Sequence, residues 1–572
     1  MESIAHIRKS DNKIQTVEQH LLEVKNLAES YGGRVNVAHV TGLAGMLHDV
    51  GKFTEEFSTY IKKAVENPDN PPKRGSVDHS TAGGMFLYEL LHKNGSSTNE
   101  KILAELVGNA IISHHGFLKD FNNPSLDSKY LSRVNKEEKK DVYANYEEFS
   151  IYFYSKVMDE SSFANYINKA VAEIGEYIIQ SAPVPLRTSL YYLTTFVFSA
   201  LVDADRTNTR LFEEGNVHSG KNTHELFELY NTKLEEHLIG LQQSPASRTA
   251  INQLRMDMSE ECKKFAKNES GIYSLSIPTG GGKTLASLRY ALNHALEHGK
   301  ERIIYVIPYT SIIDQNAKLV KAILDDDTNI VEHHSNVDFG SSNEKELDDE
   351  LDEMLMNKRE KIRLATDNWD APIIFTTMVQ YLNAFYAKGN RNTRRLHNLT
   401  NAVVIFDEVQ KVPSKCLSLF SESVNFLDMM GNSSILLCTA TQPGLESIKR
   451  KICLKDEIVN NLPEVVKAFK RTEIIDKVKE GKMNKEDLTI FVEGLMQENQ
   501  SLLIILNTKK AAKDLFILLD AMIVDTNIYH LSTSMCAKHR TAILEKVKDD
   551  LNHKKKTICV STQLIEAGVD IS

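Results

Sequence analysis

The stretch Ser276–Thr284 reads S-I-P-T-G-G-G-K-T, and the remainder of the chain is organised around it. It follows a short apolar run, Ile272–Leu275, and precedes Leu285–Leu292, whose apolar spacing is helical. A strand, a glycine-rich loop and a helix in this order form the context of a phosphate-binding loop. The strict pattern has glycine where this chain has Ile277, five residues before the last glycine.

The residues of this loop predict a nucleotide site with Mg²⁺. Backbone N–H groups of a glycine-rich loop turn toward an anion, and the following helix adds the positive end of its dipole. We therefore expect ATP phosphates to bind at Gly280, Gly281, Gly282 and Lys283, and Thr284 to be a ligand of Mg²⁺.

Length and composition indicate a multidomain globular protein. A chain of 572 residues predicts about three domains, and 41% apolar and 26% charged residues are ordinary for this class. The net charge of −10 argues against a uniformly basic surface, although one groove can still be basic. Six cysteines without a CxxC pair indicate a reducing compartment and no cysteine-based zinc site. Without a long apolar segment at the N-terminus, we expect a cytoplasmic protein with no membrane partner.

Residues 1–215 show helical apolar spacing with few strand signals, which predicts an all-α domain. Histidine alone is an ordinary residue, but a set of histidines and carboxylates near helix ends in one domain suits a pair of transition-metal ions. A bridging carboxylate such as Asp49 can hold two ions about 3.5–4 Å apart, as in phosphodiester hydrolysis. The set comprises His20, His48, Asp49, His79, His114, His115, Asp203 and Asp205.

Beyond a polar linker at 216–247, strands and helices alternate. Residues 248–460 predict a doubly wound parallel sheet, with ligands at the carboxyl ends of its strands, and 461–572 predict a second α/β unit. Asp407 and Glu408 follow an apolar strand, so Asp407 is expected to hold Mg²⁺ and Glu408 to polarise the attacking water. Hydroxyls at the starts of helices are candidate phosphate contacts, with a simple helix cap as the alternative, and the helicase resemblance given below implies that the phosphates are those of single-stranded DNA. These hydroxyls are Thr310, Thr377 and Thr562.

The histidine motifs carry a family resemblance. M-L-H-D-V-G-K at Met46–Lys52 resembles the signature of HD-superfamily phosphohydrolases. Together with E-Q-H-L-L-E-V, V-D-H-S, S-H-H-G and L-V-D-A-D-R, it resembles the HD nuclease of the CRISPR-associated nuclease-helicase of type I systems. The downstream motifs P-Y-T-S-I-I-D-Q, F-T-T-M-V-Q and T-A-T resemble superfamily 2 helicases with RecA-like lobes.

The resemblance implies specific roles in the nuclease site. Lys52 would contact the scissile phosphate, and His48 and Asp49 would form the catalytic centre. Asp205 is favoured over Asp203, because A-D-R matches the family pattern. The two divalent ions would be Mn, Ni, Co or Fe. Their implied ligands are His20, His48, Asp49, His79, His114, His115 and Asp205.

The resemblance also implies a function and a branch of the family. The implied protein nicks and degrades single-stranded DNA, moves 3′ to 5′ on ATP, and is recruited by an RNA-guided surveillance complex in antiviral defence. The stretches Asp367–Ile374 and Arg394–Asn398 look like subtype I-C, and Gln410 in the nucleotide site stands where many members have histidine.

The end of the sequence suggests a form truncated at the C-terminus, with an incomplete second lobe. The chain stops at Ser572, before the arginine-bearing Q-x-x-G-R-x-x-R segment of these helicases. Because an arginine finger contributes roughly 10³–10⁵-fold to the rate in such sites, we expect weak ATP binding and poor hydrolysis.

Two other functions fit the same motifs. The chain could be an HD phosphohydrolase of small nucleotides with a regulatory motor domain, or a non-catalytic, ATP-gated DNA-binding module. Metal content and a comparison of single-stranded DNA with free nucleotides as substrates would separate the three.

Overall fold

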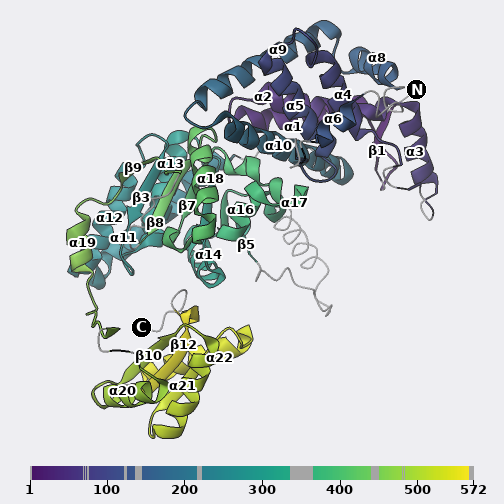
Figure 1. Ribbon diagram of the computed structural model, residues 1–572. Coiled ribbons are helices and arrows are strands. Elements are labelled where there is room, and N and C mark those ends of the chain that lie inside the picture. Colours follow the sequence, from purple (N-terminus) through teal and green to yellow (C-terminus); the bar gives the residue numbers. More distant parts are fainter. Residues whose placement is uncertain are drawn as a thin grey trace. The chain divides into compact units, whose positions relative to one another are not determined.

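The chain forms two compact units, one made of Met1–Pro308 with Val320–Phe469 and the other of Tyr309–Leu319 with Lys470–Ser572 (Figure 1). The first unit contains a helical domain and a large parallel sheet, and the second contains a small parallel sheet. The computed structural model describes residues 3–565 except 9, 68–69, 71, 74–75, 121–124, 126, 136–144, 216–221, 335–364, 440–449, 479–480 and 482.

The amino-terminal part of the chain is helical, as its apolar spacing predicts. A short antiparallel pair, β1 (Ile4–Ile7) and β2 (Ile14–Thr16), precedes the helices and was not expected from the sequence. Thr16 caps the first helix by accepting a hydrogen bond from the Gln19 N–H. The helices are α1 (Val17–Gly33), α2 (Ala38–Leu47), η1 (Val50–Phe53), α3 (Glu55–Glu66), α4 (Ser80–Leu91), α5 (Thr98–Ser113), α6 (Lys129–Val134), α8 (Tyr146–Lys156), α9 (Glu160–Gln180) and α10 (Leu186–Glu214).

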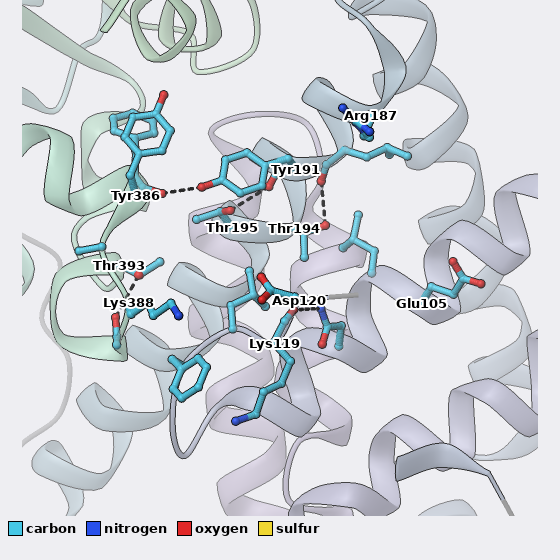
Figure 2. A pocket seen from close by; sticks show the side chains of 18 of the residues that line it. Glu105, Lys119, Asp120, Arg187, Tyr191, Thr194, Thr195, Tyr386, Lys388 and Thr393 are labelled. Carbon is cyan, nitrogen blue, oxygen red and sulfur yellow. Dashed lines mark hydrogen bonds between the residues drawn. The ribbon is translucent and has the colours of Figure 1, made fainter. Parts of the chain in front are cut away.

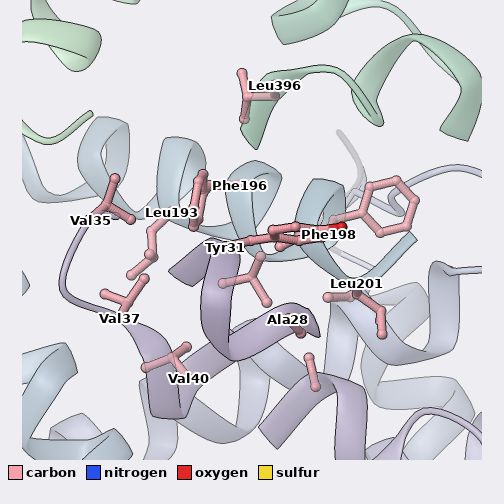
Figure 3. Close-up of a cluster of buried hydrophobic side chains, with 14 of the residues drawn as sticks. Ala28, Tyr31, Val35, Val37, Val40, Leu193, Phe196, Phe198, Leu201 and Leu396 are labelled. Atoms are coloured by element: carbon pink, nitrogen blue, oxygen red, sulfur yellow. The ribbon is translucent and has the colours of Figure 1, made fainter. Parts of the chain in front are cut away.

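Helix α10 lies at the centre of the first unit. It is 29 residues long and packs against α1, α2 and α5. Figure 3 shows Phe196, Phe198 and Leu201 of α10 beside Tyr31 of α1, with Leu396 on the opposite side of α10. Because Leu396 belongs to the sheet-containing part of the unit, one apolar core joins that part to the helical domain.

The large sheet is entirely parallel, with strand order β5-β6-β4-β7-β8-β3-β9, which confirms the predicted doubly wound architecture. Its inner strands are continuous apolar runs, as expected for a sheet covered on both faces. The two edge strands, β5 and β9, were not predicted, and β9 is mostly exposed. The strands are β3 (Ile272–Ser276), β4 (Arg302–Ile307), β5 (Ile330–His333), β6 (Ile373–Thr377), β7 (Ala402–Phe406), β8 (Ser434–Thr439) and β9 (Leu454–Glu457).

Helices pack on this sheet in two groups. Helix α13 contacts β4, β7 and β8 and is covered in turn by α11 and α12, whereas α16 and α18 contact the sheet and each other. Within the predicted linker, α11 is therefore a docked helix, and Glu235 of α11 accepts two hydrogen bonds of 2.7 Å from Arg289 of α13. The helices of this part of the chain are α11 (Thr223–Gln243), α12 (Ala250–Phe265), α13 (Lys283–His298), α16 (Met378–Tyr386), α17 (Asn390–Thr393), η3 (Leu396–Leu399), η4 (Val409–Lys411), α18 (Leu417–Met429) and α19 (Leu462–Ala468). Helix α14 (Thr310–Leu324) begins in the second unit.

The second unit has a parallel sheet with strand order β10-β12-β11. Its elements are α20 (Lys485–Glu498), β10 (Ser501–Leu506), α21 (Lys509–Met522), β11 (Asn527–Leu531), α22 (Ala537–Asn552) and β12 (Thr557–Thr562). In the described parts of both units, every helix is too short or too polar to cross a membrane.

Candidate metal centre and nucleotide site

Asp49 lies at the centre of the histidine cluster. Its Oδ2 atom is 3.4 Å from His20 Nε2 and 3.3 Å from His48 Nε2. Its Oδ1 atom is 3.6 Å from His79 Nε2 and 3.5 Å from His114 Nε2. Each oxygen of one carboxylate thus faces a different pair of imidazoles.

The remaining residues expected in this cluster lie on its two sides. Asp205 Oδ1 is 3.6 Å from the Nε2 atoms of both His20 and His48. On the other side, His115 Nε2 is 2.7 Å from His79 Nε2. The structure therefore gathers the seven residues that the resemblance implied as ligands, drawn from α1, α10, the ends of α2 and α5 and the N-cap of α4. Asp203 stays outside the cluster.

Hydrogen bonds at the far nitrogens orient three of these imidazoles. His48 Nδ1 donates to Gly45 O at 2.8 Å, and His114 Nδ1 donates to Ile111 O at 2.6 Å. His20 Nδ1 lies 2.8 Å from Asn208 Oδ1. These contacts leave each Nε2 atom directed at the cluster, as outer partners do for metal-binding histidines.

Sequence reasoning missed the outer partners of His20. Asn208 Nδ2 donates to Glu23 Oε2 at 2.6 Å, and Gln15 Nε2 donates to both Asn208 and Glu23. Helical spacing was the available signal, because Glu23 lies three residues after His20, and Asn208 lies three residues after Asp205.

The electrostatics of the cluster depend on burial and on close opposite charges. Burial opposes ionisation of Asp49, yet Lys52 and His48 hold the pKa of this carboxyl well below its usual range. Burial likewise opposes charge on His48, but Asp49 and Asp205 raise its pKa to about 10. Burial lowers the pKa of His79 to about 4 and that of His115 to about 3.

Two atoms of the cluster have unused bonding capacity. Among the described residues, the buried atoms Asp49 Oδ1 and His114 Nε2 make no hydrogen bond. The Lys52 ammonium, which was expected to contact a phosphate, lies 2.7 Å from Asp49 Oδ2. Imidazole nitrogens and carboxylate oxygens with unsatisfied lone pairs are suited to divalent transition metals. The residues present therefore fit a metal centre.

The glycine loop between β3 and α13 has a backbone conformation and close packing that require glycine. Gly280 and Gly282 have φ values of 77° and 85°, a region that favours glycine. A Cβ atom on Gly281 would lie 2.6 Å from Ile277 Cγ2 and 2.8 Å from Pro278 O. Arg255 of α12, which the sequence did not single out, donates to Gly280 O at 2.7 Å.

The predicted nucleotide residues lie together at the carboxyl ends of β3 and β7. Lys283 Nζ is 2.5 Å from Glu408 Oε1 and 3.2 Å from Asp407 Oδ1. Burial disfavours a charged Lys283, but these carboxylates raise its pKa. Thr284 follows Lys283 in the first turn of α13.

Gln410 connects two strands at this site. Its Nε2 atom donates to Glu408 Oε2, and its Oε1 atom accepts a 2.9 Å hydrogen bond from Thr439 at the end of β8. Glu408 has a φ of 52°, an uncommon left-handed conformation for a residue other than glycine. The rest of the T-A-T motif, Ala440 and Thr441, lies outside the described residues.

The three threonines expected to contact DNA lie at element ends. Thr377 Oγ1 accepts a 3.2 Å hydrogen bond from the Gln380 N–H and so caps α16. Thr310 is the first residue of α14, and Thr562 is the last residue of β12. Thr377 belongs to the first unit, whereas Thr310 and Thr562 belong to the second.

A cleft of about 800 Å³ lies elsewhere in the first unit, between α5, α10 and the segment from Phe385 to Thr393. Figure 2 shows Arg187 and Tyr191 of α10 on one side and Tyr386 and Lys388 on the other. The Tyr191 hydroxyl donates to Phe385 O at 2.9 Å. The histidine cluster does not line this cleft, so the two features are separate.

Comparison with protein families finds three matches along the chain. Residues 11–169 match the family described as Cas3, HD domain. Residues 256–449 match DEAD/DEAH box helicase, and residues 498–572 match CRISPR-associated nuclease/helicase Cas3, C-terminal. The three matches follow one another in the order of the helical domain, the large sheet and the small sheet.

Relatives and solved structures agree with these matches. A CRISPR-associated nuclease/helicase Cas3 of Haloferax volcanii is 23% identical over 444 residues, which cover 70% of this chain and 45% of the relative. A relative from Methanocaldococcus jannaschii is 25% identical over 326 residues, covering 54% of this chain and 42% of the relative. The chain thus spans about half the length of these relatives. The crystal structure of T. fusca Cas3 with ATP has the same fold, with a TM-score of 0.55, 17% identity, and coverage of 100% of this chain and 70% of that one.

Proposed function

Because this chain belongs to the Cas3 family of CRISPR-associated nuclease-helicases, we propose that it cleaves single-stranded DNA with a metal centre and moves on DNA with ATP. Residues 1–215 would be the HD nuclease domain, 216–247 a linker, 248–460 the first RecA-like lobe and 461–572 the second. Its expected setting is the cytoplasm, where an RNA-guided surveillance complex would deliver the DNA. Subtype I-C and 3′-to-5′ movement belong to the same proposal.

The observation that carries the nuclease proposal is the placement of Asp49 between two sets of imidazoles. His20, His48 and Asp205 would hold one ion with Asp49 Oδ2. His79, His114 and His115, which lie at Asp49 Oδ1, would hold the other, so Asp49 would belong to both ligand sets. Bound divalent ions of this kind supply a hydroxide nucleophile at neutral pH and stabilise the negative charge that develops on a phosphodiester.

The residues of this chain would contribute orientation and charge to cleavage. Asn208 and Gly45 O fix the rings of His20 and His48, so that little reorganisation is needed when ligands bind. The ion pair with Asp49 holds Lys52 at the metal centre. When DNA binds, the Lys52 ammonium would move from Asp49 to a phosphate oxygen. Lys52 is 6% exposed, and a cation in such a dry place stabilises an anionic transition state more strongly than one in water.

The motor proposal rests on the glycine loop and the acidic pair that faces it. Lys283 would exchange its contacts with Asp407 and Glu408 for phosphate oxygens, which would free the carboxylates for Mg²⁺ and for the attacking water. Gln410 hydrogen-bonds both Glu408 and Thr439, so it would couple the position of the Glu408 carboxylate to Thr439 on the neighbouring strand. Thr310, Thr377 and Thr562 remain candidates for DNA phosphate contacts.

The test is cleavage of single-stranded DNA with Mn²⁺, Ni²⁺ or Co²⁺ by the chain and by its Asp49→Ala variant. Asp49→Ala and His48→Ala should abolish metal-dependent cleavage and leave ATP binding unchanged. Asp11→Ala, which removes an exposed carboxylate of the same domain, is the matched control and should cut at the parental rate. Undiminished cutting by Asp49→Ala would refute the metal assignment.

The two alternative functions predict other outcomes in the same assay. A nucleotide phosphohydrolase would cleave free or cyclic nucleotides in preference to DNA. A non-catalytic binding module would bind DNA in an ATP-dependent manner, without bound metal and without cleavage.

A further inference from the structure

Asp203 and Asp205 point to different sides of α10, and only Asp205 faces the histidine cluster. Two residues apart on a helix are rotated by about 200° from each other. Asp203 is 1% exposed, and among the described residues its side-chain hydrogen bonds and ion pairs are all with the large-sheet lobe rather than with the helical domain. This buried carboxylate therefore links the helix that carries Asp205 to a different domain.

The partners of Asp203 satisfy both of its oxygens. Arg394 Nε donates to Oδ1, and His397 Nε2 lies 3.2 Å from Oδ2. Asn368 Nδ2 lies 3.2 Å from Oδ1 and 3.3 Å from Oδ2. Burying a charge is unfavourable unless it is paired and hydrogen-bonded, so this geometry fixes the position of α10 on the lobe.

The same helix is anchored to the lobe at several further points between Tyr191 and Asp203. The Tyr191 hydroxyl donates to Phe385 O, and the Tyr192 hydroxyl lies 2.6 Å from that of Tyr386 (Figure 2 shows Tyr191 and Tyr386). One helical turn before Asp203, the Ser199 hydroxyl accepts a hydrogen bond from the His397 N–H at 3.1 Å. Asp203 is the last of these anchors before the residues that face the cluster.

The residues just beyond this anchor serve the metal centre. Asp205 lies beside His20 and His48, and Asn208 holds the ring of His20. A shift or rotation of α10 would therefore move a ligand and the partner of a second ligand together. The position of α10 at Asp203 therefore sets the positions of both Asp205 and Asn208.

The residues in contact with Asp203 also belong to the elements that surround the motor site. Asn368 precedes β6, which ends at Thr377, and Arg394 and His397 precede β7, which leads to Asp407. The sequence stretches around Asn368 and Arg394, which looked like markers of a family branch, thus meet at one carboxylate of the helical domain.

We propose that Asp203 is a positioning residue for the nuclease: clamped by Arg394, His397 and Asn368 of the first lobe, it sets α10 so that Asp205 and Asn208 complete the metal centre. This inference rests on the proposed metal-dependent nuclease. If Asp203 has this role, side chains of the motor lobe contribute to the affinity of the helical domain for metal, even in the absence of ATP.

The test compares Asp203→Asn and Arg394→Gln with the parent chain of residues 1–572, freed of metal. Mn²⁺ binding is measured by electron paramagnetic resonance, and cleavage of single-stranded DNA is measured without ATP. Both variants should bind Mn²⁺ about tenfold or more weakly, as other outer partners of metal ligands do, and should recover cleavage at saturating Mn²⁺. Parental Mn²⁺ affinity in both would overturn the inference.

A matched control and a milder variant keep the result interpretable. Glu301→Gln breaks the Arg34–Glu301 ion pair, which joins the same two domains at the end of α1, and it should leave Mn²⁺ affinity unchanged. If Asp203→Asn does not fold, Asn368→Ala, which removes a neutral donor, must show the weakened Mn²⁺ binding instead.

A double variant separates positioning from mere stability. Asp203→Asn combined with Arg394→Gln removes both buried charges, so the unfolding midpoint should recover while Mn²⁺ affinity stays low. Recovery of Mn²⁺ affinity together with the midpoint would show that Asp203 only stabilises the fold. If Asp49→Ala still cleaved DNA, the proposed nuclease would fail, whereas parental Mn²⁺ binding by Asp203→Asn would refute only the positioning role.

Discussion

Metal binding to the histidine cluster should release about one proton per molecule, and His48 should be its source. The His48 Nδ1–H is already committed to Gly45 O, so the second proton of the charged ring lies on Nε2, between Asp49 and Asp205. A cation bound at Nε2 must displace that proton. His79 and His115 release none at neutral pH, because burial keeps their pKa values at about 4 and about 3.

The magnitude follows from the raised pKa of His48. With a pKa of about 10, only about one molecule in a thousand has a neutral His48 at pH 7. Competition with this proton over three pH units lowers the apparent binding free energy by about 4 kcal/mol. Since the proton is held below pH 10, apparent Mn²⁺ affinity should rise about tenfold for each pH unit between 6.5 and 8.

Calorimetric titration of the metal-free chain with Mn²⁺ tests this reasoning. Titrations in buffers of different ionisation enthalpy give the number of protons released. Protons lost from a metal-bound water would increase with pH, whereas release from His48 stays constant at about one between pH 6.5 and 8. Full Mn²⁺ binding with no proton released, or an affinity independent of pH, would refute the charged state of His48.

Three further substitutions, and one control at Gly494, test the two sites separately. Gly281→Ala should abolish binding of a fluorescent ATP analogue, because the new Cβ would lie 2.8 Å from the Pro278 carbonyl oxygen of the loop. The control is Gly494→Ala on α20, where a Cβ meets no atom within 4 Å; it should raise the free energy of unfolding by about 0.5–1 kcal/mol. Lys283→Ala should lose nucleotide binding and keep Mn²⁺-dependent cleavage measured without ATP; loss of both activities would contradict the separation of the sites. Asn208→Ala should weaken Mn²⁺ binding about 10- to 100-fold by releasing the ring of His20, and an unchanged affinity would show that Asn208 does not orient this ligand.

Local patterns were sufficient to predict most of the fold. The apolar run Ile272–Leu275 and the helical spacing of Leu285–Leu292 lie within β3 and α13, because both signals depend on residues that are adjacent in the sequence. The edge strands β5 and β9 carry polar residues and lack such a run, so they could be recognised only through their partners in the sheet.

The sites show a similar division between local and distant information. Motif spacing was enough to select the histidines and carboxylates that gather around Asp49. It could not show that Asp203 faces the motor lobe, since its partners Arg394 and His397 lie about 190 residues further along the chain. Helical spacing places Glu23 and Asn208 on the faces that carry His20 and Asp205, but the contact between them joins two helices distant in sequence and is visible only in the structure.

The pairing of β3 has a consequence for the order in which the protein matures during synthesis. β3, which leads into the glycine loop, pairs with β8 and β9, so Ile272 aligns with Ile435 and with Leu454. At about 5–20 residues per second, a ribosome adds the intervening stretch in roughly 10–40 seconds. Throughout that interval the nascent β3 lacks its β9 neighbour, so the strand that leads into the glycine loop is paired on both sides only after β9 has left the exit tunnel.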